Sequence, residues 1–304
     1  SSLLTQQRKY REGELAALRG LQWEKNPFLY GFLAGARYRA GRLDEARRTI
    51  AYGLREFPNS VLLLALRIEM TEAMGDFGRA DSLAHSAPRG NNEFPRQQQA
   101  FIDAILGKID EARQHLVDVR RAQEATGGLS AVLTSLLLAQ LELDLARDTS
   151  RALRIADSVP SSAAWRNLHA RERPYVSLAH FYVLSGKADR ARELLSTFER
   201  EVPVDFRARV LRLSSRTHAM VRVAAGDRAA ISEIKASVAD DPQPISVLAD
   251  LVWAYQRVGA HESAAREARA YLDEVSPRRM EQDAFYLSSM RKLAKTAATS
   301  AVRK

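Results

Sequence analysis

Residues 175–203 read YVSLAHFYVLSGKADRARELLSTFEREVP, with two helical patterns on either side of one glycine. Before the glycine, large apolar residues recur every three or four positions from Tyr175 to Tyr182. After it, the same spacing runs from Ala191 to Phe198. This spacing is typical of helices that bury one face. Glycine adopts left-handed backbone angles without strain, so the stretch predicts a hairpin of two helices.

The turn of this hairpin, a glycine followed five positions later by alanine, recurs along the chain. The clear copies are Gly41 with Ala46, Gly75 with Ala80, Gly107 with Ala112, Gly186 with Ala191, and Gly259 with Ala264. Two weaker copies are Arg147 with Ala152 and Gly226 with Ile231. Successive anchors are 32 to 40 residues apart. This period fits two helices of about 13 residues with short connections, so we predict an all-α chain of about seven helical hairpins.

Three regions follow from this repeat. Residues 1–26 are expected to form a leading helix, residues 27–277 the repeats, and residues 278–304 a closing helix and tail. Asp44 and Asp76 each follow a loop glycine, as Asp227 does, so these side chains are expected to cap the next helix. The tryptophans Trp23 and Trp165 are expected to pack in the core or at hairpin junctions.

Several positions resemble those of the tetratricopeptide repeat (TPR) family. The matches are an early large residue (Tyr30, Tyr175, Leu248), an aromatic residue before the loop glycine (Tyr182, Tyr255), and a closing proline (Pro58, Pro203). The resemblance implies a right-handed α-solenoid of TPR-like hairpins with flanking helices. Residues 271–295 are also similar to the C-terminal repeat region of some bacterial Ser/Thr kinases, which implies a bacterial signalling protein.

Composition excludes several classes of protein. The 304 residues include no cysteine, which rules out disulfide scaffolds, thiolate metal sites and cysteine nucleophiles. The 46 basic and 37 acidic residues leave a net charge of +9, but basic and acidic residues alternate along the chain. We therefore interpret most arginines as residues of solvated helix faces.

No uninterrupted apolar segment reaches the length of a membrane span. The chain begins with Ser1 rather than methionine, and we expect it to be part of a longer protein. A cytoplasmic location is expected, with the extracytoplasmic part of a membrane protein as the alternative.

Catalytic and cofactor motifs are missing from the sequence. No HExxH, phosphate-binding glycine loop or GxSxG motif occurs. His169 and Glu172 lie one turn apart, which is weak evidence for a metal site, and His180 lies in an apolar run that favours a partly buried, hydrogen-bonded side chain. We therefore predict a protein that is not an enzyme and needs no cofactor or metal.

The first helix of each hairpin is expected to line the inner groove of the solenoid. Alignment on the loop anchors predicts these groove residues: Phe28, Tyr38, Arg39, Phe101, Arg173, His180, Arg216, Met220, Trp253, Gln256 and Arg257. Asp144 falls on the same face. Arginine binds carboxylates through two hydrogen bonds, and tryptophan provides an apolar contact. The groove therefore predicts a protein or peptide partner with acidic and apolar side chains.

Two alternatives remain open at this stage. The basic balance permits a nucleic-acid-binding repeat protein, although no pair of base-reading residues recurs at a constant place in each repeat. The end helices also permit a scaffold that assembles with itself.

Overall fold

A computed structural model describes residues 9–86, 93–126, 128–238, 244–274 and 279–301. Within these ranges every regular element is a helix, as the sequence predicts. The chain divides into two compact units. Unit 1 comprises residues 1–108 and 275–284, and unit 2 comprises residues 109–274 and 285–304.

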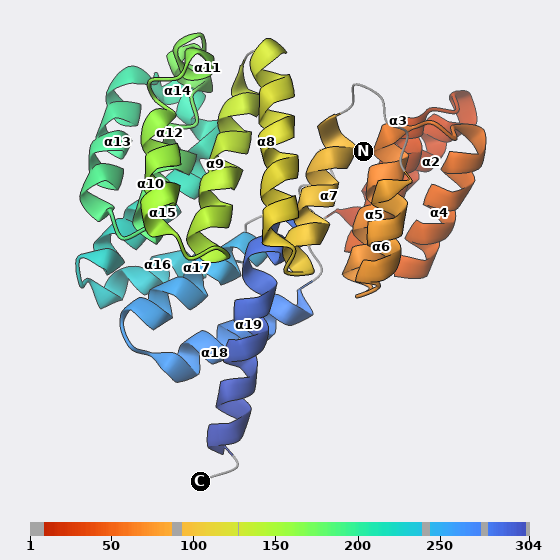
Figure 1. Cartoon of the computed structure of the whole chain (residues 1–304). Coiled ribbons are helices and arrows are strands. Elements are labelled where there is room, and N and C mark those ends of the chain that lie inside the picture. Colours follow the sequence, from red (N-terminus) through yellow and green to blue (C-terminus); the bar gives the residue numbers. More distant parts are fainter. Residues whose placement is uncertain (1–8, 87–92, 127, 239–243, 275–278, 302–304) are drawn as a thin grey trace. The chain divides into compact units, whose positions relative to one another are not determined.

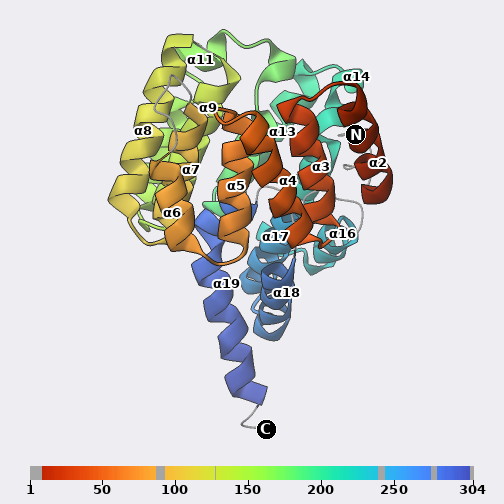
Figure 2. The same ribbon diagram turned by 90° about the vertical axis from the view of Figure 1, so that its right-hand side faces the viewer.

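Unit 1 is a row of antiparallel helices in which each helix packs against the next along the chain (Figure 2). Its helices are α2 (Tyr10–Trp23), α3 (Pro27–Arg39), α4 (Leu43–Glu56), α5 (Val61–Ala73), α6 (Phe77–His85) and α7 (Glu93–Ile105). One buried core cluster joins Tyr30 of α3, Ile50 of α4 and Leu63 of α5. Helix α3 also packs directly on α5, as successive first helices do in a stack of hairpins.

Unit 2 contains the longer run of hairpins (Figure 1). Its helices are α8 (Ile109–Thr126), α9 (Leu129–Asp144), α10 (Thr149–Ser158), α11 (Ala163–Arg166), α12 (Tyr175–Leu184), α13 (Ala188–Glu201), α14 (Val204–Arg207), α15 (Leu211–Ala224), α16 (Ile231–Ala236), α17 (Pro244–Arg257) and α18 (His261–Asp273). Short 3-10 turns cover Ala170–Glu172, Ala208–Val210 and Arg228–Ala230. Helix α19 (Arg279–Ala301) follows, and from Phe285 onward it belongs to unit 2.

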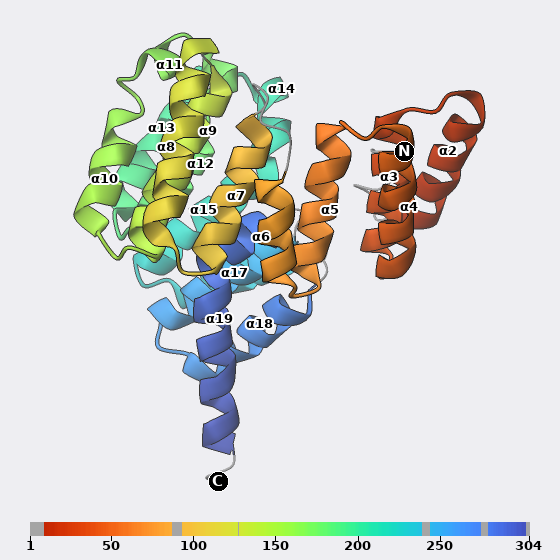
Figure 3. The same cartoon turned by 45° about the vertical axis from the view of Figure 1, so that its right-hand side comes forward.

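Packing within unit 2 follows the hairpin pattern. The tightest pairs are α9 with α10, α12 with α13 and α17 with α18, and the views of Figures 1 and 3 agree on these neighbours. At one hairpin junction the ring of Tyr175 lies 5.2 Å from that of Trp165 and 6.3 Å from that of Phe198. Trp165 is buried there, as predicted, whereas Trp23 is 91% exposed and packs in no core.

The loop anchors adopt the backbone that the sequence predicts. Gly186 has φ of +78°, and the glycines of the other anchors are also in the left-handed region. The N–H of Lys187 donates to the carbonyl of Tyr182 at 2.7 Å, which closes the first helix. Arg147, where the repeat lacks its glycine, has φ of +57° and is the one non-glycine residue with positive φ among the described residues.

Helix caps agree with the prediction in two cases of three. The carboxylate of Asp76 accepts from the N–H of Arg79 at 3.2 Å, and that of Asp227 accepts from the N–H of Ala229 at 2.9 Å. Asp44 does not cap, because α4 begins one residue earlier, at Leu43. Its carboxylate lies in the first turn instead, where negative charge still favours the helix dipole.

Candidate functional site

Three successive first helices of unit 2 bring ionisable side chains together around one aspartate. Asp250 of α17 contacts Nε of Arg216 of α15 through Oδ2 at 2.7 Å. Its Oδ1 lies 2.8 Å from Nε2 of His180 of α12. The side chains of Arg216 and Asp250 are 5% and 4% exposed, whereas that of His180 is 20% exposed. The imidazole is therefore the member of this group that solvent or a partner can reach.

The electrostatics of Asp250 depend on its two basic neighbours. Burial by itself would raise the pKa of this carboxyl group, because a charge is costly away from water. The charges of His180 and Arg216 and their hydrogen bonds outweigh that effect and hold the pKa of Asp250 below its usual range. Asp250 is thus an ionised carboxylate that fixes the positions of the Arg216 guanidinium and the His180 imidazole.

A fourth ionisable residue extends this group onto α9. Asp144, the last residue of that helix, lies close enough to His180 for the two charges to interact. It accepts a short hydrogen bond from Nε2 of Gln140, which also lies 3.1 Å from the hydroxyl of Tyr286. We call Asp144, His180, Arg216 and Asp250 the charge cluster. It draws one residue from each of four successive first helices: α9, α12, α15 and α17.

Asp144 is expected to make the stability of the chain depend on pH. Asp144 as a residue is partly exposed, but its carboxyl group lies among packed helices, and burial raises its pKa to about 6. An unfolded aspartate titrates near pKa 3.9, so the folded chain binds more protons between about pH 4 and about pH 6. Ionised Asp144 therefore lowers the free energy of unfolding as the pH rises through this window, and the loss is complete above it.

The variant Asp144→Asn removes this ionisation and keeps the hydrogen-bond acceptor for Gln140. We expect it to be about 1 to 3 kcal/mol more stable than wild type at about pH 8, with the difference vanishing near pH 4. Urea unfolding at several pH values measures the difference. The control Asp189→Asn removes an exposed carboxylate of α13 that contacts Arg192, and it is expected to lower the free energy of unfolding slightly, by less than about 1 kcal/mol, rather than raise it. A stability difference for Asp144→Asn that stayed constant with pH would contradict the expectation.

The predicted groove residues of unit 2 fall into three groups. His180 and Arg216 belong to the charge cluster. Met220 is fully buried, so its prediction as a groove residue is wrong. The reason is that α15 packs against α12, α13, α16 and α17, which leaves that face of α15 no opening to solvent.

The remaining predicted residues of unit 2 lie at the two ends of first helices. Arg173 precedes α12 and donates to the carbonyl of Leu168 and the hydroxyl of Tyr175, both at 3.2 Å, which supports the hairpin junction. Trp253 is half-buried against the core of unit 2. Gln256 and Arg257 are exposed in the last turn of α17.

The predicted groove residues of unit 1 are mostly in its interior. Tyr38 and Phe101 are buried, and Tyr38 is part of the core cluster, so neither presents a side chain to a partner as predicted. Arg39 is half-buried. Phe28 is 60% exposed on α3, one turn before the exposed Phe32. Of the three aromatic groove residues predicted in unit 1, it is therefore the one that a partner could contact.

Sequence reasoning missed the centre of the charge cluster. Asp250 is the one charged residue in the apolar run from Ile245 to Tyr255, and a lone acid in such a run requires a partner when the helix is buried. That signal was present in the sequence. Gln140 and Tyr286 are 146 positions apart, so no local pattern could join them.

The residues proposed as metal ligands do not form a metal site in the structure. Across the described residues, no three His, Asp or Glu side chains lie together in a way that would hold a metal ion. His169 and Glu172 are joined by a hydrogen bond from the His169 N–H to the Glu172 carboxylate at 3.3 Å, which closes a short turn. No helix in the described ranges is both long and apolar enough to cross a bilayer. The charge cluster can hold the partly exposed His180 in a fixed position through the buried Arg216 and Asp250.

No family model matches this sequence, and no curated protein matches it significantly. Among solved structures, it is similar to a tetratricopeptide repeat protein from Parabacteroides merdae ATCC 43184, with 15% identity and a TM-score of 0.49 over 87% of this chain and 96% of that one. A monomeric mutant of IFIT1 with Gppp-AAAA gives 14% identity and a TM-score of 0.43, over 97% of this chain and 80% of that one.

A structure of Naa15/Naa10 bound to HypK-THB gives 14% identity and a TM-score of 0.37 over 91% of this chain and 42% of that one. Scores of this size carry no argument about function. The TPR-like architecture rests on the hairpins and loop anchors of the chain itself. The resemblance of residues 271–295 to bacterial kinases stays a prediction.

Proposed function

We propose that this chain is a non-catalytic helical-repeat scaffold that binds a segment of a partner protein on the first-helix face of unit 2. The charge cluster is the observation that supports this proposal most strongly. A buried ion pair contributes little net stability compared with apolar packing. The presence of one here therefore favours a role in holding ionisable side chains at fixed positions for a partner. Here the cluster places the accessible His180 beside the partly exposed Asp144.

Helix α17 continues this surface from the cluster toward solvent. Asp250, Trp253 and Arg257 follow one another at spacings of three and four, so they share one face of the helix. Trp253 is partly exposed and Arg257 is exposed, and no acidic partner of Arg257 is found among the described residues. An arginine binds a carboxylate through paired hydrogen bonds, and a tryptophan binds an apolar side chain. The surface therefore fits an extended peptide with alternating acidic and apolar residues.

The test uses a fluorescein-labelled peptide of alternating glutamate and leucine or phenylalanine, measured by fluorescence anisotropy. Wild type is expected to bind it saturably, and Trp253→Ala/Arg257→Gln is expected to bind at least about tenfold more weakly. The control Arg269→Gln, exposed on α18, is expected to bind as wild type does. Arg216 is left intact, because its contact with Asp250 supports the fold.

Two results would overturn this function. One is the absence of saturable peptide binding by wild type, and the other is equal affinity of wild type and the Trp253→Ala/Arg257→Gln variant. A labelled single-stranded RNA of about 20 nucleotides, added in parallel, distinguishes the nucleic-acid alternative. RNA bound more tightly than the peptide, equally by all variants and released by salt, would replace the scaffold proposal with a basic-surface function.

A further inference from the structure

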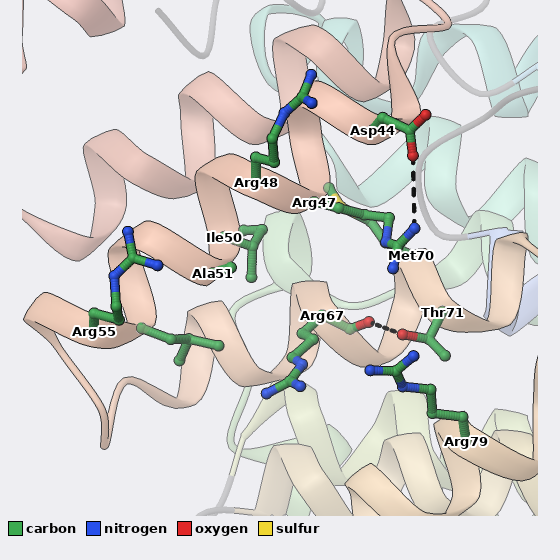
Figure 4. Close-up of a pocket in the computed structure, with 11 residues that line it drawn as sticks. Asp44, Arg47, Arg48, Ile50, Ala51, Arg55, Arg67, Met70, Thr71 and Arg79 are labelled. Atoms are coloured by element: carbon green, nitrogen blue, oxygen red, sulfur yellow. Dashed lines mark hydrogen bonds and ion pairs between the residues drawn. The ribbon is translucent and has the colours of Figure 1, made fainter.

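Unit 1 contains a pocket that lies outside the proposed partner-binding face. It is formed by α4, α5 and α6 and has a volume of about 610 Å³ (Figure 4). Five arginines line it, together with one acidic residue, Asp44. We call it the arginine pocket, and its arginines are Arg47, Arg48, Arg55, Arg67 and Arg79. Its apolar wall includes Ile50, Leu54 and Met70, and the side chains of Ile50 and Met70 are buried core residues.

The charges of this pocket are poorly balanced. Arg47 contacts Asp44 at 3.6 Å, and the guanidinium of Arg55 lies 5.1 Å from the centre of the Tyr52 ring. No acidic partner of Arg67 or Arg79 is found among the described residues. Two other arginines of unit 1 do have one, because Arg37 and Arg42 both contact Glu14, Arg37 at 2.8 Å.

The arrangement of the side chains brings the like charges together. Figure 4 shows the side chains of Arg67, from α5, and Arg79, from α6, on the same side of the pocket, with the guanidinium of Arg79 extending toward the side on which Arg67 lies. Arg47 approaches the same space from α4, whereas Arg48 extends away from it. Two guanidinium groups that share a partly enclosed space repel each other, and water screens them less there than on an open surface. A bound anion between them would turn this repulsion into two attractions.

We propose that the arginine pocket binds a small molecule that carries clustered phosphate groups. The volume is in the range of small-ligand sites and is too small for a folded partner. The planar guanidinium fork matches phosphate oxygens in a bidentate manner. Each phosphate monoester carries up to about two negative charges at neutral pH, so two or three phosphates compensate this set of arginines where a single carboxylate would not.

Isothermal titration calorimetry with sodium tripolyphosphate tests the proposal directly. Wild type is expected to bind one equivalent at near-physiological salt, and Arg67→Gln/Arg79→Gln is expected to bind at least about tenfold more weakly. The control Arg11→Gln/Arg19→Gln removes the same charge from exposed positions of α2 and is expected to change the affinity less than about twofold. Thermal melting of each variant verifies that it is folded.

A hexaglutamate peptide tests whether phosphate is the recognised group, and it is expected to bind at least about tenfold more weakly than tripolyphosphate. Equal binding of the two anions would overturn the phosphate assignment. The site itself would be overturned if wild type bound no tripolyphosphate, or if both double variants lost affinity to the same extent. None of these outcomes bears on the peptide test of unit 2, because the substituted residues all belong to unit 1.

Discussion

Replacing Asp250 with leucine is expected to lower the free energy of unfolding by about 3 to 5 kcal/mol. The substitution keeps the branched shape of the side chain but removes the carboxylate that contacts Arg216 at 2.7 Å and His180 at 2.8 Å. The buried guanidinium of Arg216 then loses this counter-charge, and removing one partner of a buried ion pair is far more costly than removing a surface contact. Urea unfolding followed by circular dichroism at neutral pH measures the loss.

A double variant distinguishes the destabilisation caused by leaving Arg216 without Asp250 from the net contribution of the ion pair to stability. In Asp250→Leu/Arg216→Met both charges are replaced by apolar groups of similar shape, and we expect most of the stability to return, to within about 1 to 2 kcal/mol of wild type. The exposed control Asp189→Leu on α13 should change stability by less than about 1 kcal/mol. If the double variant lost as much stability as the Asp250→Leu and Arg216→Met variants lose together, the cost would not come from a buried charge without its partner.

Gly53→Ala is expected to destabilise the chain by about 1 to 3 kcal/mol, although alanine favours a helix interior over glycine by about 1 kcal/mol. A Cβ at Gly53 would lie 2.9 Å from Cδ1 of Leu63 and 3.0 Å from Cβ and Cγ of Tyr30. Both neighbours are buried in the core of unit 1, and the Tyr30 atoms are close to the backbone of α3. Packing therefore outweighs helix propensity at this position.

Gly35 provides the matched control, because it also lies inside a helix of unit 1, but a Cβ there would meet no atom within 4 Å. Gly35→Ala is expected to stabilise the chain by about 0.5 to 1 kcal/mol. Thermal and urea unfolding of the two variants should thus give shifts of opposite sign. Two shifts of the same sign would mean that the close approach at Gly53 does not limit the packing of α3, α4 and α5.

The hairpins could be predicted from the sequence because their signals are local. A glycine at positive φ and an apolar spacing of three or four residues act within one or two turns of helix. The spacing of the repeat also predicts an anchor at Arg147, where glycine is missing, and this residue adopts the left-handed backbone of the glycine anchors, with φ of +57°. Ala46 and Ala191 are buried after their turns as the pattern indicates.

The candidate site was predicted only in part because burial depends on neighbours that are distant in sequence. His180 and Met220 occupy the same position relative to their loop glycines, six residues before each. His180 remains partly exposed, whereas Met220 is enclosed because α15 packs against four other helices. The position of a residue within its own helix cannot reveal this difference. The same limit applies to Tyr38 and Phe101, which the sequence placed in the groove and the structure places in the interior.

The contact between His180 and Asp250 has a consequence for how unit 2 unfolds. Repeat arrays are usually described by the stability of each repeat and by its interface with the next one. His180 belongs to the hairpin of α12, and Asp250 to that of α17, so this contact passes over the intervening hairpin of α15. Loss of the last hairpin would remove a polar contact of His180 and the counter-charge of Arg216 at once. We therefore expect unfolding of the last hairpin to be coupled to that of the two hairpins before it.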